Sequence, residues 1–330
     1  MNYSLIIPVF NRPDEVAELL GSLLLQKQIP HEVILVEDGS TLPCAHLVEQ
    51  FGKQLPLHYI HKENSGPGLS RNFGARAATG DYFIFLDSDC ILPPQYLAEV
   101  DSFLAGNPVD AFGGPDRADA SFTPVQKAIN QAMTSFFTTG GIRGGKQSME
   151  KFHPRSFNMG ISRQAFQTIG GFSSLRFGED IDLSLRMFSA GFRVSLIPEA
   201  YVFHKRRTDL KKFFRQVFNS GMARINLFLL HRNSLKAVHL LPALFTMGSA
   251  ALLLFSIVTV WALLPLLFVV LLLFCSALIT TGSLWVALLA VPASFVQLYG
   301  YGLGFLWAAV QKFLLGRQGE VRAFRKTLYK

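Results

Sequence analysis

Charged residues are missing from one long stretch of the chain. The protein has 330 residues, of which 16% are charged, yet no aspartate, glutamate, lysine or arginine lies between Ala237 and Gln311. A helix needs about 20 mostly apolar residues to cross the hydrocarbon core of a bilayer. We therefore expect residues 237–311 to form a transmembrane region of two or three helices. The last segment, Leu284–Val310, contains Pro292 and is open to a re-entrant or interfacial arrangement instead of a third crossing.

Cysteine is also scarce, and the N-terminus shows no cleavable leader. Cys44, Cys90 and Cys275 form neither a CxxC pair nor the spacing of metal ligands, as is typical of free thiols in a reducing compartment. Met1 to Ser4 lead directly into an apolar run, without the basic stretch, long apolar core and cleavage site of a signal peptide. These absences predict a first domain in the cytoplasm and assign no function to the cysteines.

The positive charge of the chain is concentrated beside the uncharged stretch. Basic flanks mark the cytoplasmic side of a membrane protein and are attracted to anionic lipid head groups. We expect a basic interfacial segment at residues 205–236 and a basic cytoplasmic tail at residues 312–330, with an even number of crossings between them. The net charge of +8 thus indicates a membrane partner and no nucleic acid, unless these residues form only a solvated face. They are Lys205, Arg206, Arg207, Lys211, Lys212, Arg215, Arg224, Arg232 and Lys236 before the stretch, and Lys312, Arg317, Arg322, Arg325, Lys326 and Lys330 after it.

Residues 1–204 have the pattern of an α/β domain. Short apolar runs, typical of buried strands, alternate with segments whose apolar residues recur at helical spacing. This alternation predicts a mostly parallel sheet covered by helices, which binds ligands at the carboxyl ends of its strands. The expected strands are residues 3–10, 31–36, 57–61, 82–86 and 193–197, and the expected helices are residues 14–26, 70–79 and 181–190.

Acidic residues follow two of the expected strands. Asp87 and Asp89 come directly after a buried strand, with a spacing that suits a hard divalent cation and a nucleotide-sugar. Asp38 follows a neighbouring strand, where it could accept a hydrogen bond from a nucleobase. The alternatives are a solvated or helix-capping turn for the first pair and an ordinary Asp-Gly turn for Asp38.

Two further candidates lie in the second half of the domain. Glu179 and Asp180 precede an expected helix, where a carboxylate could remove a proton from an acceptor hydroxyl or could simply cap the helix. His204 follows a strand and is either a metal ligand or a structural histidine.

Two segments differ from the regular α/β pattern. Residues 111–155 are irregular and include the glycine-rich stretch 139–146, for which we expect a mobile loop over the site. Residues 209–228 combine apolar and basic faces, which favours a helix in the membrane interface and, with it, a lipid-linked acceptor. The alternative is a helix that packs its apolar face in a core.

Taken together, these residues resemble glycosyltransferase family 2, whose members have the A-type fold built on one Rossmann-like nucleotide-binding sheet. The resemblance covers residues 3–220, and its pieces occur in the family's order. They are IPVFNR at 7–12, VEDGS at 36–40, NSGPGLSRN at 64–72, DSD at 87–89, NMG at 158–160, GGF at 170–172, GEDIDL at 178–183 and His204.

The resemblance implies a role for each matching residue. The nucleotide-sugar would be bound by Pro8, Phe10, Asn11, Asp38, Gly66, Arg71 and Asp87, with Gly66 and Arg71 closing the far side of the nucleobase pocket. Asp89, with Asp87 and His204, would hold Mn²⁺ or Mg²⁺, and Asn158 and Met159 would form the floor beneath the donor sugar. Asp180 would be the general base of a single inverting displacement, and Glu179 would orient it or contact the acceptor.

The resemblance also implies a donor class, and the uncharged stretch, its basic flanks and the segment 209–228 add an expected location and acceptor. The donor is expected to be a nucleotide diphosphate sugar, most often a UDP-sugar, and the acceptor a lipid-linked molecule or a glycan. The enzyme would be a multi-pass protein of the inner membrane with a cytoplasmic catalytic domain, acting in the synthesis of cell-envelope polysaccharide or glycolipid.

The chain departs from the family pattern at two places. Glu37 stands where an aspartate is usual, and the Gln-x-x-Arg-Trp motif of processive synthases is missing, which favours transfer of a single sugar. A sugar nucleotidyltransferase would need a glycine-rich triphosphate loop that residues 7–12 do not supply. A degenerate transferase domain that serves as a membrane scaffold remains the alternative.

Overall fold

The computed structural model describes residues 1–117, 122–140, 152–205 and 208–321, and it divides into two compact units. The first, here called the sheet unit, comprises residues 1–119 and 152–205; the second, the helical unit, comprises residues 120–151 and 206–328. The expected catalytic domain, residues 1–204, therefore differs from the sheet unit in one respect. Residues 120–151 group with the helices that follow, although they lie inside the expected domain.

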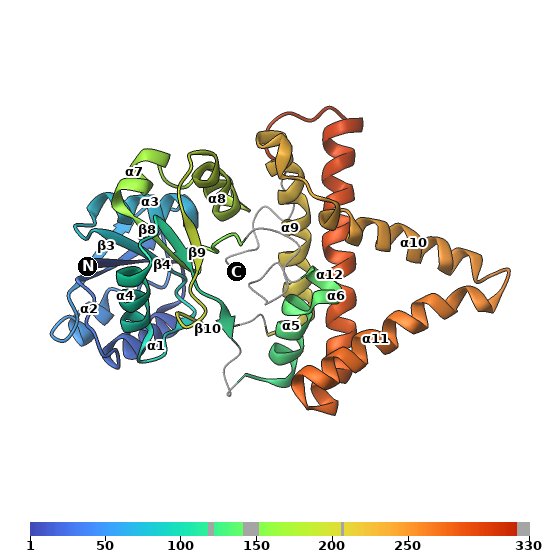
Figure 1. Ribbon diagram of the computed structural model, residues 1–330, viewed down its shortest axis with the longest axis horizontal. Coiled ribbons are helices and arrows are strands. Elements are labelled where there is room, and N and C mark those ends of the chain that lie inside the picture. The colour runs from blue at the N-terminus through green and yellow to red at the C-terminus, as the bar shows by residue number, and fades with distance from the viewer. Residues whose placement is uncertain (118–121, 141–151, 206–207, 322–330) are drawn as a thin grey trace. The chain divides into compact units, whose positions relative to one another are not determined.

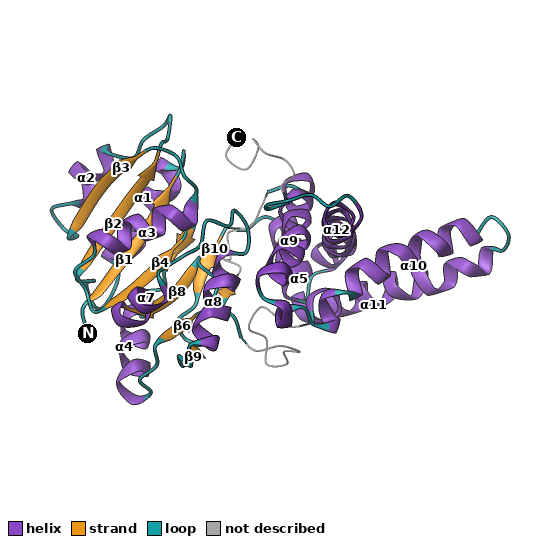
Figure 2. Ribbon diagram, turned by 90° about the horizontal axis from the view of Figure 1, so that it is seen from above, coloured by secondary structure: helices purple, strands orange, loops and turns teal. Residues whose placement is uncertain are grey.

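A seven-stranded sheet forms the centre of the sheet unit, in the order β3-β2-β1-β4-β8-β6-β9. Neighbouring strands from β3 to β4 are parallel, whereas β8 is antiparallel to both β4 and β6. The expected α/β class with a mostly parallel sheet is thus confirmed (Figure 2). The strands are β1 (Tyr3–Val9), β2 (Glu32–Asp38), β3 (Leu57–Lys62), β4 (Tyr82–Leu86), β6 (Ala111–Gly113), β8 (Asn158–Ser162) and β9 (Val194–Leu196).

Helices cover both faces of this sheet because its strands are apolar on both faces. In β1, Leu5 and Ile7 belong to one buried cluster and Ile6 to another, as expected when successive side chains point to opposite faces. The first cluster includes residues of α1 (Pro13–Leu24), α2 (His46–Phe51) and α4 (Tyr96–Gly106). The second includes residues of α3 (Pro67–Ala77), α7 (Arg163–Ile169) and α8 (Glu179–Ser189).

Helix α3 begins three residues before the expected position at Ser70. Pro67 occupies its first turn, where the missing N–H of proline costs no hydrogen bond. Gly66 precedes it with φ of 93°, in a backbone region that residues with a Cβ rarely adopt. This turn directs the backbone N–H of Gly66 toward the end of β2.

A small second sheet joins segments that are far apart in the sequence. It has the order β5-β10-β7, formed by β5 (Cys90–Ile91), β10 (Val202–His204) and β7 (Asp116–Arg117). Its register places His204 opposite Cys90, one residue after Asp89. The second sheet therefore brings the end of the sheet unit to the acidic turn that follows β4.

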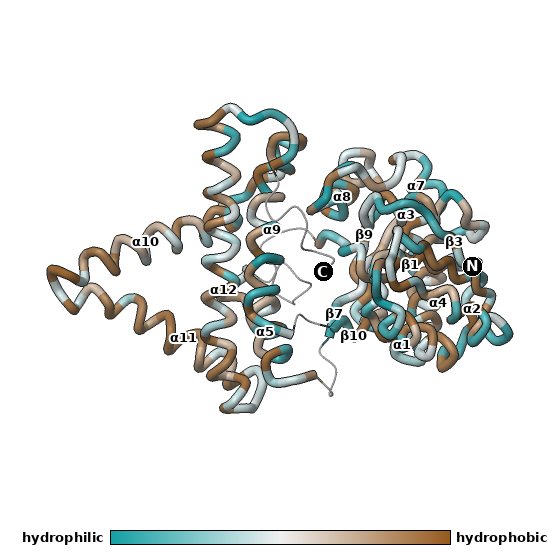
Figure 3. Tube along the Cα trace, turned by 180° about the vertical axis from the view of Figure 1, so that it is seen from behind, coloured by the Kyte–Doolittle hydropathy of each residue, from teal (hydrophilic) through white to brown (hydrophobic). Residues whose placement is uncertain are grey.

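The helical unit contains six α-helices among the described residues. They are α5 (Pro124–Thr134), α6 (Phe136–Thr139), α9 (Leu210–Leu230), α10 (Leu241–Phe255), α11 (Leu264–Thr281) and α12 (Leu284–Ala309), and α12 continues as a π-helical turn, Val310–Leu314. Three segments of the described residues are long and apolar enough to cross a membrane, namely Ala237–Phe255, Val260–Thr281 and Leu284–Leu314. Figures 1 and 3 show α10 and α11 as a hydrophobic hairpin that extends away from α12. Helix α12 is continuous through Pro292, which differs from a re-entrant segment.

Helix α9 lies along α12 (Figure 1), and its apolar face is packed in the unit. Phe213 and Val217 are buried there, as the alternative of a core-packing helix expects. The backbones approach closely, because a Cβ on Gly304 would lie 2.0 Å from the Phe218 carbonyl oxygen and one on Gly221 would lie 2.2 Å from that of Tyr301.

The irregular segment of the sequence contains two helices, α5 and the short α6, that the pattern did not predict. Helix α5 begins with a capping box, in which Thr123 and Gln126 satisfy each other's backbone N–H groups. The Thr-Pro-x-Gln order was the available signal. Most of the glycine-rich stretch 139–146, the expected mobile loop, lies outside the described residues.

Candidate active site

The acidic residues predicted from the sequence meet at the carboxyl edge of the main sheet. Asp38 ends β2, Asp87 and Asp89 follow β4, and Glu179 and Asp180 begin α8. The structure divides these acids into two kinds by the groups that bind them. One kind is held by backbone N–H groups, and the other by arginine side chains.

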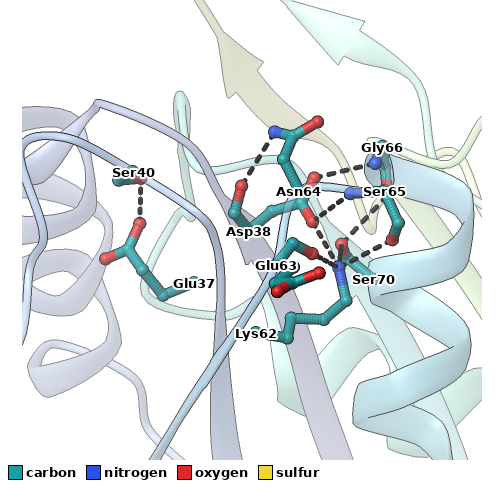
Figure 4. A network of polar contacts seen from close by, with 9 residues as sticks. All are labelled: Glu37, Asp38, Ser40, Lys62, Glu63, Asn64, Ser65, Gly66 and Ser70. Carbon is teal, nitrogen blue, oxygen red and sulfur yellow. Dashed lines mark hydrogen bonds and ion pairs between the residues drawn. The ribbon is translucent and has the colours of Figure 1, made fainter.

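Asp38 is held by the loop between β3 and α3 (Figure 4). Its side chain is buried; Oδ2 accepts a hydrogen bond from Gly66 N at 2.9 Å, and Oδ1 accepts one from Ser65 N at 2.8 Å. Lys62 also donates to Oδ1 and binds Ser65 and Ser70. Asp38 therefore fixes the loop that begins α3, in addition to any contact it makes with a base.

The other expected base-pocket residues lie at the end of β1 and directly after it. Pro8 in β1 and Phe10 after it are partly exposed at this edge. Asn11 has φ of 54°, and its Oδ1 accepts hydrogen bonds from Thr41 N at 2.8 Å and Leu42 N at 2.9 Å. Asn11 thus connects the β1–α1 turn to the segment after β2.

Glu37, the departure from the family pattern, is fully buried. Its carboxylate accepts hydrogen bonds from Ser40 Oγ and from Cys44 N, the latter at 2.8 Å. The longer side chain therefore shapes the segment after β2 and leaves Asp38 in its expected position.

Arg71 connects two acids instead of only closing a nucleobase pocket. Its guanidinium is 2% exposed and donates to Asp87 Oδ1 at 2.5 Å and to Glu179 Oε1 at 3.3 Å. The ring of Phe172 lies 5.5 Å from the guanidinium carbon. Burial and the neighbouring charge of Asp180 raise the pKa of Glu179 to about 7, although Arg71 opposes the rise. Arg71 thereby links the expected phosphate end of the site to the start of α8.

Asp180 is bound by an arginine that the sequence analysis did not identify. Its Oδ2 accepts from Arg155 Nε at 2.8 Å, and its Oδ1 accepts from Ile181 N at 2.8 Å. Helix α8 is preceded by Gly178, which has φ of 80° and makes no side-chain cap. Glu179 and Asp180 therefore engage arginines and are not simple capping residues.

Asp89 and His204 form the best candidate for a metal centre. His204 Nε2 lies 3.1 Å from Asp89 Oδ1, and its ring stacks on Phe157 with centroids 4.8 Å apart. Burial acts to lower the pKa of His204, but the charge of Asp89 and hydrogen bonding with Asp116 and Asp89 outweigh it and raise the pKa to about 9. Arg12 Nη1 contacts the other oxygen of Asp89 at 2.5 Å.

The donor set fits a cation such as Mn²⁺ or Mg²⁺ only in part. Among the described residues, Asp89, Cys90 and His204 offer ligand atoms within 4.8 Å of one another. A carboxylate oxygen suits Mn²⁺, and the imidazole nitrogen of His204 suits it once the ion displaces the proton that the raised pKa holds there. Burial and nearby acids raise the pKa of the Cys90 thiol and keep it protonated. Asp87, expected among the ligands, is bound to Arg71 and lies outside this group.

The two residues expected at the floor of the sugar pocket, Asn158 and Met159, are fully buried. Asn158 is 0% exposed, and its side chain accepts from Tyr96 Oη at 2.6 Å and donates to the Ala200 carbonyl at 2.8 Å. Met159 is also 0% exposed and packs in the buried cluster with Phe85. Both residues support the sheet from inside, so neither side chain offers a surface to a sugar.

The family model described as glycosyl transferase family 2 matches residues 4–170, just over half of the chain. The chain belongs to glycosyltransferase family 2. This confirms the expected membership, and the matched residues include Asp38, Asp87 and Asp89 but end before Glu179 and Asp180.

Individual relatives resemble this family member over different lengths. The glycosyltransferase AglE of Haloferax volcanii is 25% identical over 74% of this chain and 80% of its own length. An uncharacterized glycosyltransferase of Rickettsia felis is 41% identical, but over only 26% of this chain and 14% of the relative. The chain thus spans a small part of some curated relatives that it matches.

Solved structures share the fold. The mannosyltransferase PcManGT of Pyrobaculum calidifontis, solved with GDP-Man and Mn²⁺, has a TM-score of 0.58 and 19% identity over 96% of this chain and 88% of that one. Residues 1–349 of S. aureus TarS, solved with UDP-GlcNAc, give a TM-score of 0.50 and 18% identity over 96% of this chain and 93% of that one. At these identities the likeness concerns the fold alone.

Proposed function

We propose that this family 2 member is an inverting glycosyltransferase that moves one sugar from a nucleotide diphosphate sugar to an acceptor, with Asp180 as the general base. The observation that carries the proposal is the arrangement of acids around Arg71. This buried arginine joins Asp87, at the expected diphosphate end, to Glu179, the neighbour of Asp180. Donor and acceptor chemistry are thereby connected within one cluster.

Asp180 is suited to exchange its partner for a substrate. The side chain of Arg155 is 31% exposed, whereas that of Asp180 is 7% exposed, so the arginine can leave toward solvent while the acid stays in place. An acceptor hydroxyl that replaces Arg155 would donate its proton to Oδ2 as its oxygen attacks the anomeric carbon. The nucleotide diphosphate leaves from the opposite face, which inverts the anomeric configuration.

Asp89 and His204 are proposed to hold Mn²⁺ or Mg²⁺. Such an ion, when bound, would neutralise the charge that develops on the leaving diphosphate. Arg12, which contacts Asp89, is long enough and exposed enough to turn from this carboxylate toward a phosphate. The presence of Mn²⁺ beside GDP-Man in the PcManGT structure supports this assignment.

The nucleobase is proposed to bind beside Pro8, Phe10, Asn11 and the loop that Asp38 holds. A carboxylate has about four acceptor positions, so Asp38 can receive a base N–H in addition to its three donors. A UDP-sugar is the donor we propose first, and the UDP-GlcNAc complex of TarS is an example in this fold.

The acceptor is proposed to be a lipid-linked molecule or a glycan at the membrane. The observation behind this proposal is the set of three apolar segments in the helical unit. We further propose an inner-membrane location, a cytoplasmic catalytic domain, and a role in cell-envelope polysaccharide or glycolipid synthesis.

The test is release of nucleoside diphosphate by the purified full-length protein. UDP-, GDP- and dTDP-sugars are supplied with bacterial lipid extract, with and without Mn²⁺, beside the Asp180→Asn variant. Metal-dependent release from one donor, abolished in the variant, supports the transferase and names its donor. Absence of release together with absence of nucleotide binding would replace it with the scaffold alternative.

A further inference from the structure

The hairpin formed by α10 and α11 has almost no protein cover. Only 22% of the most apolar window of Ala237–Phe255 and 17% of that of Val260–Thr281 is buried. Large apolar side chains near the tip are strongly exposed, including Leu254 at 70% and Trp261 at 71%. At 1.5 Å per residue, the longer segment spans about 33 Å, close to the thickness of a bilayer core. The composition and length of the hairpin therefore fit contact with the acyl chains of a bilayer.

Helix α12 has a different environment, although its sequence is also uncharged. Its most apolar window is 44% buried, because α5, α9, α10 and α11 all pack against it. Gly302 approaches the start of α10, since a Cβ there would lie 2.4 Å from the Pro242 carbonyl oxygen. Ala277 of α11 shares a buried cluster with Ala287 and Ala290 of α12. The hairpin therefore rests on α12 at its open end and extends away from it (Figures 1 and 2).

Helix α9 carries charge along the side of α12. Lys211 and Lys212 are exposed in the first turn of α9, and Arg224 is 7% exposed farther along it. The α9 and α12 backbones meet at Gly304, so a crossing by α12 would take the charged α9 into the hydrocarbon core with it. Ionisable side chains in that region are rare, because the charged form loses its hydration.

We infer that α10 and α11 alone cross the bilayer, and that α12 lies with α9 in the head-group region. The partner of this surface is a bilayer that contains anionic lipid, which the basic side chains of α9 would meet. Both ends of α12 then lie on the same side of the membrane. The inference concerns topology only, and it does not depend on the proposed transfer reaction.

The three tryptophans of the chain are placed where they distinguish the two topologies. Trp261 lies at the tip of the hairpin, Trp285 near the start of α12 and Trp307 near its end. Trp285 and Trp307 are 22 residues apart along one helix, or about 33 Å. If α12 crosses, Trp307 lies on the side of Trp261; if α12 is interfacial, Trp307 lies on the side of Trp285.

The experiment labels single cysteines with a membrane-impermeant maleimide. Trp261→Cys, Trp285→Cys and Trp307→Cys are each placed in a Cys275→Ser chain, because Cys44 and Cys90 are buried. Sealed right-side-out and inverted membrane vesicles are compared. We expect positions 285 and 307 to react in the same vesicle type and position 261 to react in the other. Reaction of 307 together with 261, and apart from 285, would overturn the inference.

A second measurement protects the test against variants that fail to insert. Paired Trp→Phe substitutions leave one native tryptophan at a time in full-length protein, which is reconstituted in vesicles of equal parts phosphatidylethanolamine and phosphatidylglycerol. Lipids brominated deep in the acyl chain should quench a tryptophan in the middle of α12 less than lipids brominated near the head group do, whereas Trp285 and Trp307 lie near a head-group layer in either topology. In a chain whose own tryptophans are replaced by phenylalanine, the fluorescence of Cys275→Trp in α11 should be quenched most by the deeply brominated lipids. Equally deep quenching of residues in the middle of α12, tested at Phe295→Trp, would contradict an interfacial α12.

Discussion

Two groups of acids at one sheet edge are satisfied by different partners. Asp38 is held by the backbone N–H groups of Ser65 and Gly66, which lie in one loop, together with Lys62 at the end of β3. Asp89 and Asp180 are held by Arg12 and Arg155, which come from distant segments. Asp38 and Asp180 are both buried at the same edge, and Asp89 is only 12% exposed, so burial alone does not distinguish the two groups.

The difference separates an acid that shapes the site from acids that exchange partners. Backbone N–H groups are fixed by the fold, and removing their acceptor leaves buried donors unsatisfied. Arginine side chains are long and rotatable, and those of Arg12 and Arg155 are 29% and 31% exposed. A carboxylate held by such a cation can release it when substrate or metal arrives.

The largest expected effect is at Asp180. Asp180→Asn keeps the shape of the side chain but removes the proton acceptor, so kcat should fall by about 10²- to 10⁴-fold. Affinity for the nucleotide-sugar should change little, and steady-state kinetics with direct donor binding separates the two quantities. Asp14→Asn, at an exposed acid in the first turn of α1, is the matched control. Unchanged kcat in Asp180→Asn would remove the residue from the role of base.

The next effect distinguishes Asp89 from Asp87. Asp89→Asn should weaken Mn²⁺ binding by more than tenfold, because a carboxylate ligand is lost beside His204. Asp87→Asn should weaken it less, since Asp87 is bound to Arg71 and is not grouped with the candidate ligands. Mn²⁺ binding measured by electron paramagnetic resonance without donor provides the comparison. Equal losses in both variants would show that the two acids share the ion.

A smaller effect is expected from the loop-holding acid. Asp38→Asn keeps two acceptor lone pairs at one oxygen only, so the N–H group of Ser65 or Gly66 loses its partner at a cost of about 1–3 kcal/mol. Amide hydrogen exchange should increase in residues 62–70, with α8 unaffected. Arg12→Gln, which removes an exchangeable partner, should leave exchange in this loop unchanged. Faster exchange in both variants would mean that the two groups of acids are not independent.

Local patterns were sufficient to predict five of the seven strands of the main sheet and the acids at its edge, whereas β6 and β8 were not predicted. The strand Tyr82–Leu86 was expected with the bounds that the structure shows, because five apolar residues precede an acidic turn. Asp38, Asp87 and Asp180 were found from their positions at strand ends and at a helix start. These features depend on residues that are neighbours in the sequence, which is why periodicity and motif order reveal them.

The partners of those acids could not be predicted in the same way. Arg12 and Asp89 are 77 residues apart, and they meet only after β1 and β4 pair in the sheet. Asn158 matches a family motif, yet its hydrogen bonds to Tyr96 and Ala200 occupy it inside the core. Likewise, the sequence predicted both the apolar segment Leu284–Val310 and the helix at residues 209–228, but not that the two pack together.

The smallest expected effect concerns the pH dependence that Glu179 contributes. Its folded pKa is raised from 4.5 to about 7, so its contribution to stability is complete below 4.5 and is lost as pH rises through about 7. Glu179→Gln cannot ionise, and the difference in melting temperature between wild type and variant should therefore shift in favour of the variant across that window. The pKa of about 7 already includes the opposing effect of Arg71, which binds the ionised Glu179. Thermal unfolding in detergent, followed by hydrogen exchange in α8, measures it. A difference in melting temperature that stays constant between pH 4.5 and about 7 would show that Arg71 compensates fully for the buried charge. Glu179 would then belong with the acids that the fold holds fixed, and not with those that exchange partners.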